Sequence, residues 1–317
     1  MTRRTVMLWA ALLAAVASSN LHAQQQFVLF LSLLDAKGNP PVTLTPEEII
    51  LTEGGEPLTV LKVDKIEWPV KVQVLVDNGV GLGSENLIHI RNGIRDLMKS
   101  LPSEVEVSLY TTAPQPRNIV KPTMDRLQLL QGADRIAPDT GTGRYIESLN
   151  EATQRIERDK TPHFPVIISV ATSMGDTNVM ERDVDALWKR LNERPTTVHT
   201  VLLSGGGRNV NSFTAANQTQ VGLAVKNLTG GRYDNIAAAS RLASLLPEIG
   251  AQVAESHQRQ SRQFRLVIER AKGKSGPLGP IGGRLHVEAH VRRRHAVIAG
   301  CPMPRVSSCH NRTHPLR

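Results

Sequence analysis

Aromatic side chains are scarce in this sequence. Phe, Trp and Tyr together make up 3% of the 317 residues, whereas hydrophobic residues as a whole make up 40%. The core must therefore be built mainly from Leu, Val, Ile and Ala. Proteins that bind carbohydrate or single-stranded nucleic acid rely on stacked aromatic rings, so this composition argues against both classes of binding protein.

Cysteine is almost as scarce. The two cysteines, Cys301 and Cys309, both lie near the carboxyl terminus. In an oxidising compartment they could close one small disulfide loop. His310 and His314 follow them, but the spacing matches no usual pair of zinc ligands, so a disulfide or free thiols are favoured over a zinc site.

Long apolar runs are missing after residue 23. Residues 1–23 place Arg3 and Arg4 ahead of the apolar run 6–17 and end on polar and small residues, an order typical of a secretory signal peptide. A membrane-spanning helix needs about 20 apolar residues, and this run is shorter. We therefore expect an exported chain, periplasmic or secreted, with no transmembrane segment.

Charge is unevenly distributed. The formal net charge is +9, and many of the basic residues follow residue 258. Such a basic end is either a solvated surface, which is the simpler interpretation, or a surface attracted to anionic lipid, cell-wall polymer or nucleic acid. The shortage of aromatic rings leads us to expect no nucleic-acid partner.

The middle of the chain alternates apolar strands with helices. We expect strands at Val70–Val76, Val105–Tyr110, Pro165–Ala171 and Thr197–Leu203, and helices at Ser84–Ser100, Met124–Ile136, Gly143–Arg158, Val179–Glu193, Thr219–Leu228 and Ala237–Gln258. This alternation is typical of a parallel sheet covered on both faces. The predicted fold is α/β, with a doubly wound, mostly parallel sheet over residues 69–258. Ligands of such sheets bind at the carboxyl ends of the strands.

Smaller β segments are expected on either side of this domain. Residues 24–68 predict a small antiparallel β module with a tight turn at Gly54 and Gly55. Residues 259–300 predict a C-terminal β hairpin from strands Gln263–Glu269 and Gly282–His290, and residues 301–317 form a basic tail.

Four stretches carry a family resemblance. They are DAKGNPPVTLTPEEIILTEGGEPLTVLKV near the start, VQVLVDNGVG at the first α/β strand, DTGTGRYIESLNEA before a helix, and PVIISVATSMGDT at a later strand. Over roughly residues 27–296 the chain resembles von Willebrand factor type A domain proteins, especially the exported VWFA-related proteins of soil bacteria such as Acidobacteria. The resemblance implies a Rossmann-like α/β fold and a role in protein or peptide adhesion.

The same resemblance implies where a metal ion would lie. Such domains hold a divalent ion with an Asp-x-Ser-x-Ser loop, a Thr from a second loop and an Asp from a third. The corresponding residues here are Asp77, Asn78, Gly79 and Gly81 in the first loop, Thr142 or Gly143 in the second, and Ser173 with nearby Asp176 in the third.

These replacements remove most of the oxygen ligands that Mg²⁺ requires. We expect no cofactor, or weak Mg²⁺ binding at Asp77 through water with Thr142 or Asp176 assisting. The favoured interpretation is that Asp77 is a strand-end residue that hydrogen-bonds its own loop. The site is therefore predicted to be a degenerate metal-ion-dependent adhesion site.

Signals for an enzyme are weak. Gly79, Gly81 and Gly83 give G-x-G-x-G, which lacks the spacing of a dinucleotide loop and the Lys of a phosphate loop. His199 and Ser204 are close in sequence, but there is no G-x-S-x-G elbow. We predict no catalytic residues and no enzymatic activity.

Two functions remain. The leading hypothesis is a non-enzymatic exported binding or adhesion module whose rim of loops around Asp77, Thr142, Ser173 and Gly205 contacts a protein or peptide. The alternative is an envelope structural protein that docks on anionic surfaces through its basic C-terminal region. Charge-driven contacts between exposed groups weaken as salt rises, so salt dependence separates the two hypotheses.

Overall fold

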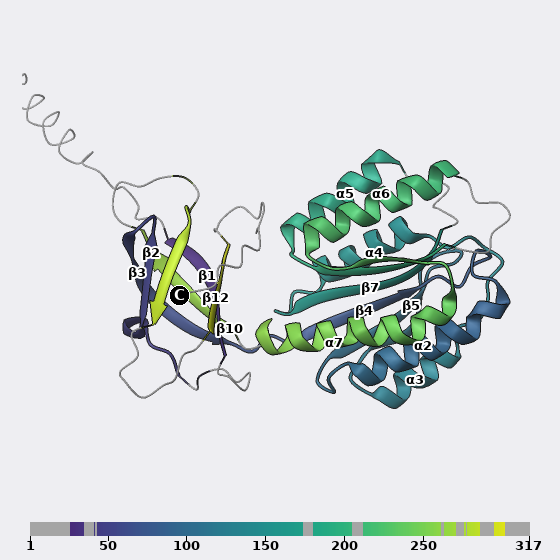
Figure 1. Ribbon diagram of the computed structural model, residues 1–317, viewed down its shortest axis with the longest axis horizontal. Coiled ribbons are helices and arrows are strands. Elements are labelled where there is room, and N and C mark those ends of the chain that lie inside the picture. The colour runs from purple at the N-terminus through teal and green to yellow at the C-terminus, as the bar shows by residue number, and fades with distance from the viewer. Residues whose placement is uncertain are drawn as a thin grey trace, which may run out of the picture.

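Two six-stranded sheets organise this chain (Figure 1). The computed structural model describes residues 26–34, 41, 43–173, 180–204, 212–260, 263–270, 276, 278–285 and 295–301. One sheet is mostly parallel and carries helices on both faces, and we call this part the α/β unit. The other sheet is antiparallel, and we call it the β unit.

The α/β unit is built around a central strand. Its strands are β4 (Val70–Val76), β5 (Glu106–Thr111), β6 (Arg117–Thr123), β7 (Phe164–Thr172), β8 (Thr197–Leu203) and β9 (Tyr233–Ile236). They lie in the order β6-β5-β4-β7-β8-β9, and β6 at one edge runs antiparallel to β5. The chain moves outward from β4 to β5 and β6, then crosses to β7 on the other side of β4. This reversal places a topological switch point, where such sheets bind ligands, at the carboxyl end of β4.

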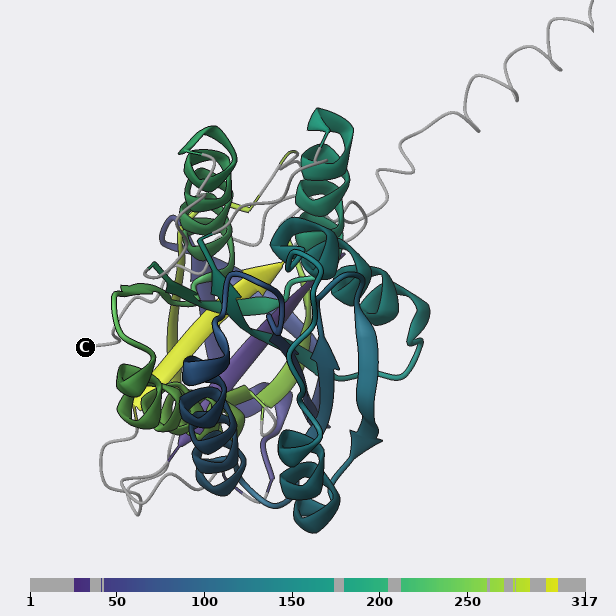
Figure 2. The same cartoon turned by 90° about the vertical axis from the view of Figure 1, so that its right-hand side faces the viewer.

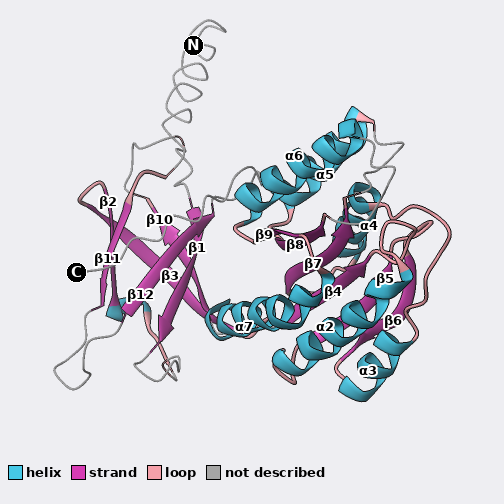
Figure 3. Ribbon diagram, turned by 45° about the vertical axis from the view of Figure 1, so that its right-hand side comes forward, coloured by secondary structure: helices cyan, strands magenta, loops and turns pink. Residues whose placement is uncertain are grey.

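In the part of the chain that the structure describes, six helices cover the sheet on both sides (Figure 3). They are α2 (Leu87–Ser100), α3 (Arg126–Asp134), α4 (Tyr145–Arg158), α5 (Glu181–Glu193), α6 (Ser212–Thr229) and α7 (Leu242–Gln260). Short 3-10 helices lie at Pro46–Glu48, Ser84–Asn86 and Ala239–Arg241. Helices α2, α3 and α7 pack on one face, and α4, α5 and α6 pack on the other.

The strand and helix patterns explain this layering. Along β7, Val166, Ile168 and Val170 enter the core under α2 and α7, whereas Ile167 and Ala171 enter the core under α4 and α5. A strand buried on both faces must be apolar throughout. The predicted α/β fold, with its doubly wound and mostly parallel sheet, is therefore confirmed.

The sequence predicts loops where the structure has two edge strands, β6 and β9. The β6 sequence contains Arg117, Lys121 and Pro122, and charge and proline are tolerated at a sheet edge. Strand β9 has only four residues. The helix expected from Gly143 begins at Tyr145 instead, because Gly143 belongs to a loop packed against Asp77.

The β unit brings together strands from the N-terminal and C-terminal parts of the chain. Its strands are β1 (Gln26–Leu34), β2 (Ile49–Glu53), β3 (Glu56–Ile66), β10 (Gln263–Glu269), β11 (Ile281–Leu285) and β12 (His295–Cys301), in the order β11-β2-β3-β10-β1-β12. The core between them contains Phe27, Leu29, Leu31, Phe264 and Leu266. Gly54 and Gly55 have positive φ angles of 59° and 93° in the predicted turn between β2 and β3.

The expected hairpin of residues 259–300 is wrong in its pairing. Strand β10 pairs with β1 and β3, and β11 pairs with β2. The turn-forming residues between β10 and β11 indicated a change of direction but carried no information about which strands pair. The apolar strand β1 pairs with β10 on one side and with β12 on the other, so it lies inside the sheet and not at an edge.

A buried ion pair joins the N-terminal and C-terminal parts of the β unit. Nε of Arg270 donates a 2.7 Å hydrogen bond to Oε2 of Glu53, and the backbone N–H of Gly279 donates to Oε1 at 2.6 Å. The side chains of Glu53 and Arg270 are each 6% exposed. The guanidinium carbon of Arg270 also lies 5.6 Å from the centre of the Phe27 ring. Residues 217 positions apart thus hold the sheet together.

Aromatic rings mark the junction between the two units. Trp68, in the short connection from β3 to β4, lies 6.1 Å from the ring of Phe30 in β1 and 5.4 Å from the ring of Phe164 in β7. The hydroxyl of Ser32 donates to the carbonyl of Arg259 at 3.1 Å. Direct contacts therefore join the β unit to the amino ends of β4 and β7.

Several predictions fall on residues outside those described. They concern the signal peptide at residues 1–23, Asp176, Gly205, Cys309 and most of the basic tail. Cys301 is the last residue of β12 and pairs in register with Val28. Among the described residues, none of the helices is long and apolar enough to span a membrane.

Candidate functional site

Asp77 follows β4 directly and lies at the switch point. It is 4% exposed. Its Oδ1 accepts a 2.8 Å hydrogen bond from the backbone of Gly79, and its Oδ2 accepts bonds from the backbone and hydroxyl of Thr172 at 3.2 and 2.5 Å. Burial raises the pKa of Asp77 above its ordinary value, although these hydrogen bonds oppose the shift. The prediction that Asp77 hydrogen-bonds its own loop is confirmed.

The backbone of Gly143 closes over this carboxylate. A Cβ atom built on Gly143 would lie closer than 3.0 Å to three carboxyl atoms of Asp77. A Cβ on Gly79 would lie 2.7 Å from the backbone nitrogen of Gly143 and would also overlap the carbonyl of Gly141. The glycines at these two ligand positions are therefore required by close contact between the loops.

Asn78 links three loops. Its Nδ2 donates to the carbonyl of Ala137 at 2.7 Å, and its Oδ1 accepts from the backbone of Ala113 at 3.2 Å. Its own carbonyl accepts from the backbone of Asp139 at 2.7 Å. From here on the name rim is kept for the described part of the predicted surface that lies around Asp77 and Thr142, formed by residues 77–83, 112–116 and 137–144; Gly205, which was also predicted there, lies outside the described residues. The rim lies at the end of the α/β unit far from the β unit, the end that faces the viewer in Figure 2.

Further bonds tie the rim together. The backbone of Val80 donates to Gly141 at 3.0 Å, and the backbone of Arg144 donates to Thr112 at 3.3 Å. Nε of Arg144 donates to the carbonyl of Pro114 at 2.8 Å. Arg144 was missed by the sequence analysis because its role depends on the neighbouring loop.

The remaining predicted site residues that the structure describes do not complete a metal site. Ser173 is half-buried, and its backbone donates to Leu203 at 3.0 Å. Thr142 is half-buried on the rim beside Gly143, and Gly81 lies on the same surface. Within the described residues there is no group of three or more His, Cys, Asp or Glu side chains that could hold a metal ion. Both oxygens of Asp77 already accept hydrogen bonds, so the residues present do not fit a divalent ion.

Two residues behind Asp77 also escaped prediction. Nε2 of Gln218 in α6 donates to the carbonyl of Thr172 at 2.9 Å, and Thr172 in turn donates to Asp77. Gln218 is 2% exposed, and its Oε1 has no hydrogen-bond partner among the described residues. The apolar strand pattern around Thr172 gave no sign of this polar contact, because it is made only when α6 packs over β7.

His199, for which the sequence predicts no catalytic role, is buried. His199 lies in β8 and is 5% exposed. Burial, with a smaller contribution from Arg232, lowers the pKa of His199 to about 4. The hydroxyl of Ser204 donates to Asn235 at 2.5 Å. His199 is therefore neutral at physiological pH, and Ser204 has another partner.

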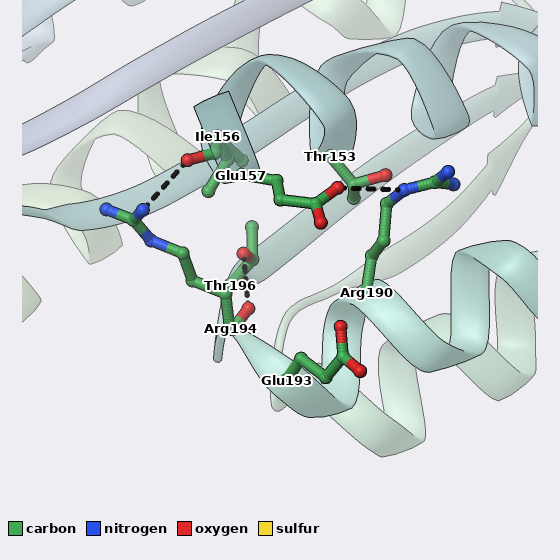
Figure 4. A pocket seen from close by; sticks show the side chains of 7 residues that line it. All are labelled: Thr153, Ile156, Glu157, Arg190, Glu193, Arg194 and Thr196. Carbon is green, nitrogen blue, oxygen red and sulfur yellow. Dashed lines mark hydrogen bonds and ion pairs between the residues drawn. The ribbon is translucent and has the colours of Figure 1, made fainter. Parts of the chain in front are cut away.

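A small pocket lies at the opposite end of the sheet, where α4 and α5 end and β8 begins (Figure 4). Arg190 forms an ion pair with Glu157 at 3.3 Å, and Arg194 donates to the carbonyl of Ile156 at 2.9 Å. The hydroxyl of Thr196 donates to the carbonyl of Arg194. The polar groups in this pocket are engaged with one another, which indicates a structural role.

No protein-family model matches this sequence, and no curated protein matches it either. The solved structures similar to this chain include von Willebrand factor type A domains. A von Willebrand factor type A protein from Catenulispora acidiphila is 9% identical, with 89% of this chain and 71% of that chain covered and a TM-score of 0.48.

Two other similar structures cover about three fifths of this chain. The von Willebrand factor domain of the type V pili tip protein Mfa5 from Porphyromonas gingivalis is 12% identical, with 61% of this chain and 98% of that chain covered and a TM-score of 0.44. The conserved hypothetical protein BatB from Bacteroides thetaiotaomicron is 15% identical, with 59% and 99% covered and a TM-score of 0.45.

Proposed function

We propose that this chain is a non-enzymatic, exported binding protein that recognises a protein or peptide partner through the rim without a metal ion. The observation that carries the proposal is the interlocking of three loops from distant parts of the sequence. Asn78 bonds to both other loops, and Val80 and Arg144 add further bonds between them. A surface held in one conformation loses little entropy when it binds a partner.

The rim also offers a place for apolar contact. Val80 is 52% exposed, although its backbone is fixed by Gly141. Gln115 is exposed, and Pro114, Pro116 and Thr142 are partly exposed. These side chains are uncharged, so binding here would depend on shape and apolar contact more than on charge.

The geometry of Asp77 supports a rim without a metal ion. An ion would have to displace the hydrogen bonds from Gly79 and Thr172 and separate Gly143 from the carboxylate. Calorimetric titration of magnesium and manganese into the chelator-stripped chain should therefore give no saturable heat. Saturable binding that is lost in Asp77→Ala would overturn this part of the proposal.

Site-specific crosslinking tests the binding surface. A photo-crosslinking amino acid replaces Val80 in the full chain, expressed in the cells that produce it, and the matched control carries the same amino acid at Leu127, an exposed residue of α3. We expect one defined protein adduct from position 80, unchanged by a chelator and lost when Thr142→Arg is added. No adduct, or the same adduct from position 127, would overturn the proposal.

The salt dependence of binding distinguishes recognition through the rim from the alternative, docking on an anionic surface. Among the basic residues of that region, Arg270 is already paired with Glu53, and many of the others lie outside the described residues. Binding to vesicles of anionic lipid that falls steeply with salt, and that is unchanged by Thr142→Arg, would favour the C-terminal region over the rim.

A further inference from the structure

Gly141 lies where the three loops of the rim meet. Its carbonyl accepts a 3.0 Å hydrogen bond from the backbone of Val80, and its own N–H donates to Oδ1 of Asp139 at 2.8 Å. A Cβ atom built on Gly141 would lie 2.4 Å from Cβ of Pro114 and 2.9 Å from its Cα. Val80 and Pro114 therefore both contact the backbone of Gly141, and we call these three residues the Gly141 patch.

The middle of the Gly141 patch is bare backbone. Gly141 is partly exposed, and because it has no side chain, the exposed part is its peptide backbone. Glycine allows a ligand to approach the backbone closely. Beside it, Val80 is 52% exposed and the ring of Pro114 is partly exposed. The patch thus combines flat peptide groups with two apolar side chains.

The charged groups of the rim are already buried or paired. Residues 77–83, 112–116 and 137–144 contain three charged side chains, those of Asp77, Asp139 and Arg144. Asp77 is 4% exposed, and Asp139 accepts the N–H of Gly141. Arg144 donates to the carbonyl of Pro114 and pairs with Glu147 at 2.9 Å. A charged group of a partner would lose water and compete with these contacts, so the patch favours an apolar group.

A flat, rigid and apolar patch suits an aromatic side chain better than an aliphatic one. An aromatic side chain buries about 150–250 Å², and it loses little conformational entropy because it has only two rotatable angles. Proline-rich segments dock on grooves lined by aromatic rings, which shows that proline rings and aromatic rings pack well together. Pro114 and the peptide groups of Gly141 offer two surfaces for one ring.

The ring has to come from a different protein. Every aromatic side chain whose burial the structure describes is buried or partly buried, so a second copy of the described part of the chain has no exposed ring to offer. A second copy would also bring the same formal net charge of +9, which opposes self-association. The favoured occupant is therefore a protein partner with an exposed aromatic residue.

We propose that the partner of the rim is anchored by a Phe, Tyr or Trp side chain that packs on the Gly141 patch, against Val80 and Pro114. This inference rests on the proposed function and adds the chemistry by which the partner is recognised. Buried aromatic anchors carry much of the affinity of protein interfaces.

Titration with N-acetyltryptophanamide, monitored by the amide NMR signals of the full chain, tests the patch. N-acetylleucinamide is the matched probe without an aromatic ring. We expect the tryptophan probe to shift the signals of Val80 and Gly141 saturably, with a dissociation constant of about 1–10 mM, and the leucine probe to leave them nearly unchanged. Val80→Asp should raise this constant at least about fivefold, because apolar contact is lost. Leu127→Asp, at an exposed position of α3, is the matched control and should bind the probe as the parent does.

Two results of this titration would overturn the inference. Equal shifts from both probes would show that the patch has no preference for an aromatic ring. Shifts that Val80→Asp leaves unchanged would place the ring on another surface. The comparison of the two probes on the parent chain needs no variant, and thermal melting establishes that each variant is folded.

The crosslinked adduct from position 80 supplies a second test. Mass spectrometry identifies the partner segment joined to position 80, and we expect that segment to contain Phe, Tyr or Trp. Replacement of this aromatic residue by Leu in the partner should abolish the adduct. A defined adduct that lacks an aromatic residue, or that survives the replacement, overturns the aromatic anchor but leaves the proposed function standing. The absence of any adduct overturns both.

Discussion

Replacement of Gly143 by alanine tests whether the loops are closed over Asp77. The added Cβ would lie closer than 3.0 Å to three carboxyl atoms of Asp77. The carboxylate has little room to retreat, because Gly79 and Thr172 hold its two oxygens. The loop has little room either, because the next residue, Arg144, is bonded to the neighbouring loop. One of these contacts must break.

The expected cost follows from two contributions. Overpacking of a buried site costs about 1–3 kcal/mol, and a buried donor that loses its partner costs about 1–3 kcal/mol. We expect Gly143→Ala to lower the free energy of unfolding by about 2–4 kcal/mol. If the loops were open in solution, the same substitution would be neutral or would stabilise the chain by about 0.4–1 kcal/mol, since alanine restricts the unfolded state.

Urea unfolding monitored by circular dichroism distinguishes the expected loss of stability from no change or a gain. Thr142→Ala is the matched control, since Thr142 is adjacent, half-buried and without a side-chain hydrogen bond in the described residues. It should change the free energy by less than about 0.5 kcal/mol. Unchanged or increased stability in Gly143→Ala would refute the closed site and would reopen the possibility of a metal ion at Asp77.

Three more perturbations address pH and the contacts of the β unit. Burial raises the folded-state pKa of Asp77 above 3.8, so the free energy of unfolding should fall as pH rises from about 4 through that raised pKa. Asp77→Asn should remove this pH dependence. Parallel curves of unfolding free energy against pH for the parent and the variant would contradict the prediction. Trp68→Ala, at the junction of the two units, should lower the free energy of unfolding by about 1–3 kcal/mol and split one calorimetric transition into two. A single unshifted transition would show that Trp68 does not couple the unfolding of the two units. Arg270→Met removes the guanidinium that donates to both carboxylate oxygens of the buried Glu53 and should cost about 3–5 kcal/mol. Adding Glu53→Gln should recover most of this cost, and no recovery would show that the ion pair is not its cause.

Most of the α/β unit could be predicted because its signals are local. The apolar run of β7 and the alternation of strands with helices both follow from burial, which leaves a direct mark on sequence. Strand β6 left no such mark, because an edge strand with Arg117, Lys121 and Pro122 has the composition of a loop. The pairing of β10 was also missed, because its partners β1 and β3 lie about 200 residues earlier in the chain.

In the candidate site, too, some features could be predicted from the sequence and others depend on contacts between distant segments. The sequence alone determined that Asp77 directly follows a strand at the carboxyl edge of a parallel sheet, and the resemblance to von Willebrand factor type A domains led us to expect hydroxyl ligands where glycine stands at positions 79 and 81. Only the tertiary structure decided what those replacements mean. Gly79 and Gly143 approach each other and Asp77 so closely that no side chain fits between them, and Thr172 supplies the donor that the carboxylate needs. Such contacts depend on the packing of distant loops, which local propensity does not encode.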